Sequence, residues 1–129
     1  MHKTSFHILR VGLAITFLWI GILIFKAPEA WGGYVSPWAL KLLPISIEQA
    51  MIGTAFLDIV VGALLLFDTL VWLGALAATI HLIIVLTVSG INEVTVRDIA
   101  ILAGATALFF DSMPASFIEK LYSNKIKIL

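Results

Sequence analysis

Two ionisable residues, Asp58 and His81, lie in the middle of long apolar segments of the sequence. Such side chains are costly inside a membrane-spanning helix unless they are paired or hydrated, and they often mark proton relays or ligand sites. Small residues share the helical face of each: Thr54, Ala55 and Gly62 around Asp58, and Gly74, Ala77 and Ala78 around His81. Because small residues let helices approach closely, we expect both side chains to face inward and to meet as a pair.

Two roles are open to this pair of catalytic candidates, Asp58 and His81. They could relay protons or hydrogen-bond the head group of a lipophilic molecule such as a quinone. The alternative is a structural hydrogen bond between two helices, which contributes only about 0.6 kcal/mol on average in membranes.

A second set of charged and aromatic residues is expected at the ends of the apolar segments. Lys26, Arg97 and Asp98, with Trp31 and Trp38 between the first two segments, could bound a pocket for an anionic or quinonoid head group. The alternative is that the charges pack against one another and that the aromatic residues form an interfacial belt.

Arg10 is a further candidate for ligand binding. It lies about one turn inside the first apolar segment, at the depth expected for Asp111 at the end of the last one. An Arg10–Asp111 pair is one interpretation, and extension of the arginine to lipid phosphates is the other.

Several kinds of chemistry are excluded by residue type. The chain contains 0 cysteines, so it has no thiolate to ligate an iron–sulfur cluster, a haem or a zinc ion. A single intramembrane histidine gives no bis-histidine haem site within one copy, although a symmetric dimer would supply two. No phosphate-binding glycine loop or HExxH motif occurs. We therefore predict no metal, haem or iron–sulfur cofactor, and the net charge of +0 indicates no nucleic-acid partner.

The elements that must position these residues are membrane-spanning helices. The chain has 129 residues, of which 61% are hydrophobic and 12% charged, and its mean hydropathy is +1.10. This composition is typical of an integral membrane protein. A spanning helix needs about 20 mostly apolar residues. Residues 6–25, 48–67 and 70–88 meet this length directly, and 94–110 does so if Arg97 and Asp98 lie at an interface.

Short connections between the last three segments predict antiparallel neighbours. The sequence thus favours an all-α membrane protein, an antiparallel up-down bundle of four transmembrane helices with an interfacial loop after the first. We expect residues 1–114 to form this transmembrane domain and 115–129 an amphipathic cytoplasmic tail that lies on the anionic leaflet. The first segment has no small-residue cleavage site and is expected to be retained. Lysine and arginine are more numerous on the side of the termini, which predicts cytoplasmic N- and C-termini.

Two stretches carry a family resemblance: LRVGLAITFLWIGILIFKAP (Leu9 to Pro28) and VRDIAILAGATALFF (Val96 to Phe110). They resemble the first and fourth helices of the DoxX family. Its first helix has an arginine, a glycine two positions later, a phenylalanine, a glycine and an exit lysine; its last opens with a basic and a polar residue before an apolar run. The matching positions are Arg10, Gly12, Phe17, Gly21 and Lys26, then Arg97, Asp98 and the run from Ile99 to Phe110.

The resemblance implies a four-helix protein of the bacterial or archaeal cell membrane. Some relatives look like quinone-linked redox subunits, others belong to membrane assemblies that handle oxidative stress, and distant eukaryotic relatives look like cargo receptors and assembly chaperones. Our leading hypothesis is a quinone- or lipid-binding membrane subunit of a redox assembly, with a redox partner subunit. If the chain takes part in catalysis, it does so as the membrane subunit of a quinone-linked oxidoreductase. The alternative is a non-enzymatic membrane scaffold or assembly factor. A homodimer is compatible with either.

Overall fold

The computed structural model describes residues 1–128, and all their regular elements are helices. The helices are α1 (Lys3–Lys26), α2 (Pro28–Gly32), α3 (Pro37–Leu42), α4 (Ile47–Leu66), α5 (Val71–Ser89), α6 (Val96–Ser112) and α7 (Ala115–Ile128). The predicted segments 6–25, 48–67, 70–88 and 94–110 coincide with α1, α4, α5 and α6 to within a few residues. The prediction of an all-α protein is confirmed.

Three helices are long and apolar enough to cross a membrane: α1, α4 and α5. A fourth crossing is counted when α6 and α7 are taken together, although the two are bent by 90° at the break between them. The prediction of helices with the length and apolarity to span a membrane is thus confirmed for three of the four expected spans.

Local sequence signals set the ends of these helices. Ser46 and Gln49 form a reciprocal capping box at the start of α4, in which each side chain bonds the backbone N–H of the other residue. The turn between α4 and α5 contains two left-handed residues, Asp68 at φ 55° and Leu70 at φ 49°. Gly90 caps the C-terminal end of α5, with a φ of 68° and a ψ of −176° that suit glycine.

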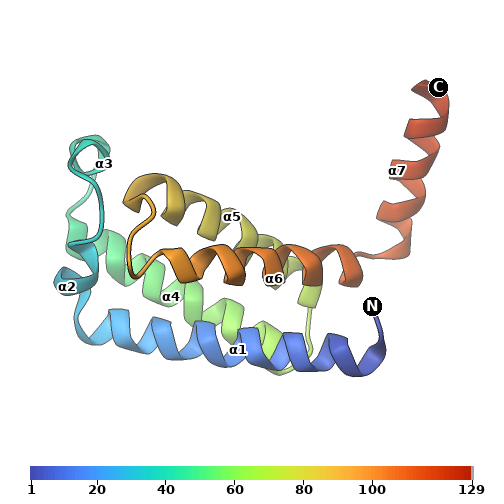
Figure 1. Ribbon diagram of the computed structural model, residues 1–129, viewed down its shortest axis with the longest axis horizontal. Coiled ribbons are helices and arrows are strands. Elements are labelled where there is room, and N and C mark those ends of the chain that lie inside the picture. Colours follow the sequence, from blue (N-terminus) through green and yellow to red (C-terminus); the bar gives the residue numbers. More distant parts are fainter. Residues whose placement is uncertain (129) are drawn as a thin grey trace.

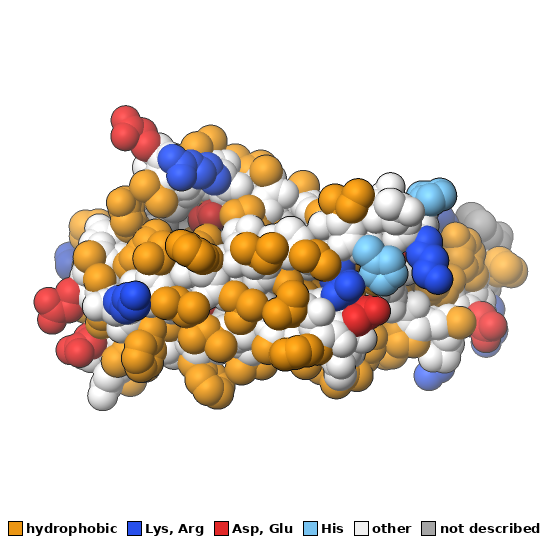
Figure 2. All heavy atoms as spheres, turned by 90° about the horizontal axis from the view of Figure 1, so that it is seen from below, with side chains coloured by type: hydrophobic (Ala, Val, Ile, Leu, Met, Phe, Trp, Pro, Cys, Tyr) orange, Lys and Arg blue, Asp and Glu red, His pale blue; other side chains and the backbone are white. Residues whose placement is uncertain are grey.

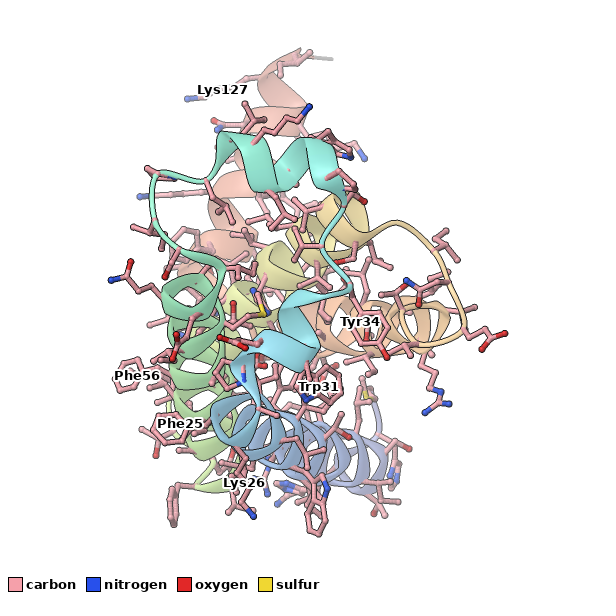
Figure 3. The ribbon with its side chains drawn as sticks, turned by 90° about the vertical axis from the view of Figure 1, so that its left-hand side faces the viewer. Phe25, Lys26, Trp31, Tyr34, Phe56 and Lys127 are labelled. Atoms are coloured by element: carbon pink, nitrogen blue, oxygen red, sulfur yellow. The ribbon has the colours of Figure 1, made fainter. Side chains whose placement is uncertain are left out.

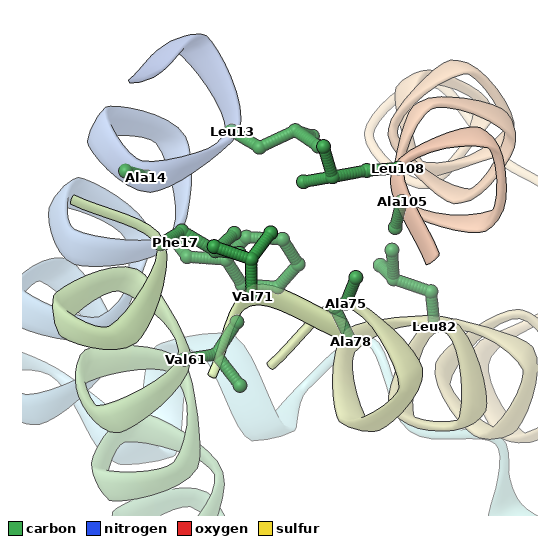
Figure 4. Close-up of a cluster of buried hydrophobic side chains, with 11 residues drawn as sticks. Leu13, Ala14, Phe17, Val61, Val71, Ala75, Ala78, Leu82, Ala105 and Leu108 are labelled. Carbon is green, nitrogen blue, oxygen red and sulfur yellow. The ribbon is translucent and has the colours of Figure 1, made fainter. Parts of the chain in front are cut away.

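The long helices pack mainly as two pairs, α1 with α4 and α5 with α6, and α4 also contacts α5 (Figure 1). A buried apolar cluster joins the pairs in the half of the molecule nearer the chain termini (Figure 4). Its members come from all four long helices: Leu13, Ala14, Phe17, Val61, Leu65, Val71, Ala75, Ala78, Leu82, Ala105 and Leu108.

Close contact between α1 and α4 depends on glycine. A Cβ atom at Gly62 would lie 2.6 Å from Leu18 Cγ and 2.9 Å from the backbone nitrogen of Leu18. Since real Cβ atoms essentially never approach so closely, a side chain at position 62 would push the two helices apart.

The outer surface of the long helices is apolar. Hydrophobic side chains cover most of the face shown in Figure 2, and charged ones gather toward its ends. Large apolar side chains such as Trp19 on α1 and Phe56 on α4 are 67% and 70% exposed. An apolar exterior of this extent is what a lipid environment requires.

The segment between α1 and α4 forms two short helices, α2 and α3, where the sequence led us to expect an interfacial loop. Helix α2 packs on α4, and the backbone N–H of Ser36 donates a 2.8 Å hydrogen bond to the carbonyl oxygen of Val88 at the end of α5. The segment therefore lies across the ends of the long helices opposite the termini (Figure 1).

Candidate functional site

A cavity of about 710 Å³ lies between the helix pairs, beneath α2 and α3. Residues of every element from α1 to α6 line it, and most of its wall is apolar. Its ionisable and hydroxyl-bearing lining residues are Thr16, Tyr34, Thr54, Asp58, His81, Ser89, Thr95, Arg97 and Asp98.

Asp58 and His81 meet at the buried end of this cavity. Asp58, on α4, is 3% exposed. Its Oδ1 atom lies 3.4 Å from Nε2 of His81 on α5. The predicted proximity of these residues is confirmed.

The contact between Asp58 and His81 is not a hydrogen bond. Oδ1 of Asp58 is buried and has no hydrogen-bond partner among the described residues. A buried carboxylate oxygen without a donor is costly. A ligand with an O–H or N–H group at this end of the cavity would supply that donor.

Gly21 lets α1 cover Asp58. A Cβ atom at Gly21 would lie 3.0 Å from the carbonyl oxygen of Ala55 and 3.2 Å from Cβ of Asp58. The sequence analysis named Gly21 only as a position of the family resemblance, and its contact with Asp58 was missed. This contact could not be predicted, because the pattern of apolar residues does not specify that α1 packs against α4.

Arg97 and Asp98 line the cavity from the start of α6. The turn before α6 holds them there. Thr95, only 3% exposed, donates a hydrogen bond from Oγ1 to the carbonyl oxygen of Gly90 at 2.5 Å. Asn92 Oδ1 accepts hydrogen bonds from the backbone N–H groups of Val94 and Thr95, at 2.8 and 3.0 Å.

Aromatic side chains of the α2–α3 segment also line the cavity. Trp31 and Trp38 both line the cavity, as the sequence analysis proposed. Tyr34, which we had not assigned to the site, joins them, with its ring centroid 6.1 Å from that of Trp31. Figure 3 views the molecule from this end and shows Trp31 and Tyr34 beside the ends of the long helices.

Two predicted ligand-binding residues lie outside the cavity lining. Lys26, the last residue of α1, is exposed and lies on the outer side of that helix (Figure 3). Arg10 lies in the other half of the molecule, nearer the termini.

The predicted Arg10–Asp111 pair is wrong. Arg10 Nη1 donates hydrogen bonds to the carbonyl oxygens of Leu65 and Leu66, at 2.5 and 3.0 Å, and Nε lies 3.6 Å from Asp68 Oδ1. Asp111 instead pairs with the amino terminus of Met1 at 2.6 Å. The reason is that α1 packs against α4, so Arg10 meets the last carbonyl groups of that helix.

No protein-family model, curated protein or solved structure matches the chain. The resemblance to the DoxX family therefore stays a prediction.

Proposed function

We propose that the chain is a four-span membrane protein of a prokaryotic cell membrane that binds a lipophilic molecule, a quinone or a lipid, in its central cavity. In this proposal α1, α4, α5 and α6 cross the bilayer as an antiparallel up-down bundle with cytoplasmic termini. The bound molecule links the chain, as a DoxX-like membrane subunit, to a redox partner protein.

The buried, unpartnered Oδ1 atom of Asp58 at the inner end of an apolar cavity is the observation that carries this proposal. Cavities of about 300–1,000 Å³ with apolar walls and a few polar groups are typical small-molecule sites. A volume of about 710 Å³ falls within this range. The combination suits an amphiphile whose polar head lies at Asp58 and His81 and whose apolar part lies along the helices.

The residues present fit a quinone. A quinone accepts two electrons and two protons on reduction to the quinol. The chain has 0 cysteines and so no thiol to supply the electrons, which in this proposal come from the redox partner. Asp58 could accept a hydrogen bond from a quinol hydroxyl, and His81 could donate to a carbonyl oxygen. The pair could also hold the protons that such a reaction takes up or releases.

The placement of α6 supports a fourth crossing. Its 17 residues give a length of about 25 Å at 1.5 Å per residue, which is shorter than a hydrocarbon core of about 30 Å, so the crossing requires local thinning of the bilayer. Arg97 and Asp98 at its start line the cavity, so their charges need not face lipid.

The test is to purify the protein in mild detergent and to identify co-purifying lipophilic molecules by mass spectrometry. Asp58→Asn keeps the shape of the side chain and removes its charge. Ala50→Phe fills part of the cavity, because Ala50 is a lining residue. Glu93→Gln is the matched control, since Glu93 is exposed and outside the lining.

The proposal requires one compound, enriched over the bulk membrane lipids, in the wild type and in Glu93→Gln. Both cavity variants should lose it while keeping the helical content and the elution volume of the wild type. Wild-type protein without any enriched compound, and without quenching of tryptophan emission by an added quinone, would reject the proposal. Trp31 and Trp38 are the cavity tryptophans that should report such binding.

A scaffold function is the second candidate, and two exposed glycines favour it. A Cβ atom at Gly12 on α1 or at Gly53 on α4 would meet nothing within 4 Å. Small outward-facing residues allow a partner helix to approach closely. Gly74 and Gly104, which the sequence would select for this test, instead face Leu64 and Leu9 within the same chain.

The scaffold candidate predicts a different pattern of variants. Gly12→Leu and Gly53→Leu should remove cross-links to a defined membrane protein, whereas Asp58→Asn should leave them unchanged. The ligand-binding proposal predicts the reverse for the retained compound. Asp58→Asn should lose it, whereas Gly12→Leu and Gly53→Leu should keep it.

A further inference from the structure

The C-terminal helix α7 makes a right angle with α6. The angle between the two helices is 90°, and Figure 1 shows α7 at the terminal end of the molecule, directed across the axes of the long helices. If the long helices cross a bilayer, α7 lies parallel to its surface. This step rests on the membrane crossing of the proposed function and not on its ligand.

The side chains of α7 divide into an apolar and a polar half. The apolar half contains Phe117, Ile118, Leu121, Tyr122, Ile126 and Ile128, and the polar half contains Glu119, Lys120, Ser123, Asn124 and Lys127. None of the residues of α7 is buried. Leu121 is 57% exposed and Ile126 is 73% exposed. A helix with these properties is typical of those that lie in a membrane interface.

The apolar half includes a residue that contacts the long helices. The ring of Phe117 lies 5.9 Å from the ring of Trp72, near the start of α5. This contact turns one edge of the apolar half toward the bundle, which is the side on which the bilayer lies. Lys125, which lies among the apolar side chains, can extend its stem along them and bring its ammonium group to the phosphates.

The charges at this end of the molecule favour an anionic surface. Helix α7 carries three lysines and one acidic residue, Glu119. Two other acids nearby already have cationic partners within the described residues: Asp111 pairs with the amino terminus of Met1, and Asp68 with Arg10. The exposed charge of α7 is therefore mainly positive. Each lysine near an anionic leaflet strengthens binding by roughly fivefold.

We propose that α7 is a surface anchor that binds the anionic lipid head groups of the leaflet on the side of the termini. Its apolar half enters the boundary between head groups and acyl chains, and its lysines contact phosphates. The occupant of this helix face is thus lipid rather than a second copy of the chain or another protein.

The experiment uses single-cysteine variants of the full chain, which has 0 native cysteines. Leu121→Cys reports the apolar half of α7 and Ser123→Cys the polar half. Each is labelled with an environment-sensitive fluorophore and placed as one copy in a lipid nanodisc, whose two faces are both open to solvent. The discs contain phosphatidylcholine alone or mixed with an equal part of phosphatidylglycerol. Acrylamide, a neutral aqueous quencher, measures the exposure of the label.

A label at Leu121 should be shielded in the anionic discs and accessible in the neutral ones, while a label at Ser123 stays accessible in both. Replacing Lys120, Lys125 and Lys127 by glutamine should lower the ratio of inserted to free α7 on the order of a hundredfold, because each lysine contributes roughly fivefold. Equal quenching at both positions in anionic discs would overturn the proposal. Equal shielding of Leu121 in both lipids, or shielding only with two copies per disc, would also overturn it.

Phe56→Cys separates failure of this inference from failure of the membrane placement. Phe56 lies in the middle of α4 and is 70% exposed, so its label should be shielded in every disc if α4 crosses the bilayer. In the anionic discs, a shielded label at Phe56 with an accessible one at Leu121 rejects the α7 anchor alone. Accessible labels at both positions reject the crossing as well.

Discussion

His81 Nε2 lies 3.4 Å from Asp58 Oδ1, and the carboxylate oxygen has no hydrogen bond. The two residues come from different helices, α4 and α5, and both line the cavity. Both side chains can therefore hydrogen-bond a ligand, because they form no hydrogen bond with each other.

His81→Gln should therefore weaken ligand binding more than it weakens the fold. The average interhelical hydrogen bond in membranes contributes about 0.6 kcal/mol, and this contact lacks that geometry, so the free energy of unfolding should change by less than about 1 kcal/mol. Loss of one ligand hydrogen bond, at about 1.4 kcal/mol, should lower the affinity for an added quinone about tenfold. Tryptophan quenching measures the affinity and unfolding in mixed SDS micelles the stability. A large loss of stability with unchanged affinity would instead make the pair structural.

Arg10→Gln should destabilise the protein by about 2 kcal/mol, because hydrogen bonds to charged groups contribute more than neutral ones. The arginine stabilises the end of α4 by donating to the carbonyl oxygens of Leu65 and Leu66. Unfolding in SDS measures the effect, and Lys41→Gln, which removes an exposed cation of α3, is the control. Because Arg10 does not line the cavity, the affinity for the ligand should stay within a factor of two or so of the wild type. An Arg10→Gln variant that keeps the unfolding free energy of the wild type but no longer binds the ligand would contradict a purely structural role for Arg10.

Gly62→Ala should separate α1 from α4 and destabilise the bundle by about 1–3 kcal/mol, as overpacking does in tight interfaces. The backbone nitrogen of Leu18 cannot move aside as a flexible side chain could. Gly53→Ala on the same helix adds the same methyl group in open space and should be neutral or slightly stabilising. Comparison of the two unfolding free energies tests the helix pairing directly. Equal effects of the two substitutions would mean that α1 and α4 do not meet at Gly62.

Gly90→Ala should destabilise the turn between α5 and α6 by about 1–3 kcal/mol, since its backbone region is almost restricted to glycine. The same turn carries Thr95, which donates to the carbonyl oxygen of Gly90 and precedes Arg97. Hydrogen exchange should therefore show faster opening of the start of α6 in this variant than in the wild type. Unchanged exchange there would indicate that the turn does not hold α6 in place.

The sequence by itself determined the long helices and the inward position of Asp58 and His81. Long apolar segments specify helices in lipid, because every backbone polar group must be bonded within its own segment. The meeting of Asp58 with His81 was also predictable. The turn at Asp68 and Thr69 is short, and the two residues lie at nearly equal distances along the chain from it.

Only the tertiary structure decided which helix each remaining charge meets. Depth along a helix can be counted from the sequence, but rotation about its axis and the choice of neighbour depend on packing between side chains distant in sequence. Arg10 therefore meets Leu65 instead of Asp111, and Lys26 lies outside the cavity. The cavity itself exists because the helix pairs pack tightly near the termini and leave space beneath α2 and α3, which no local pattern of residues specifies.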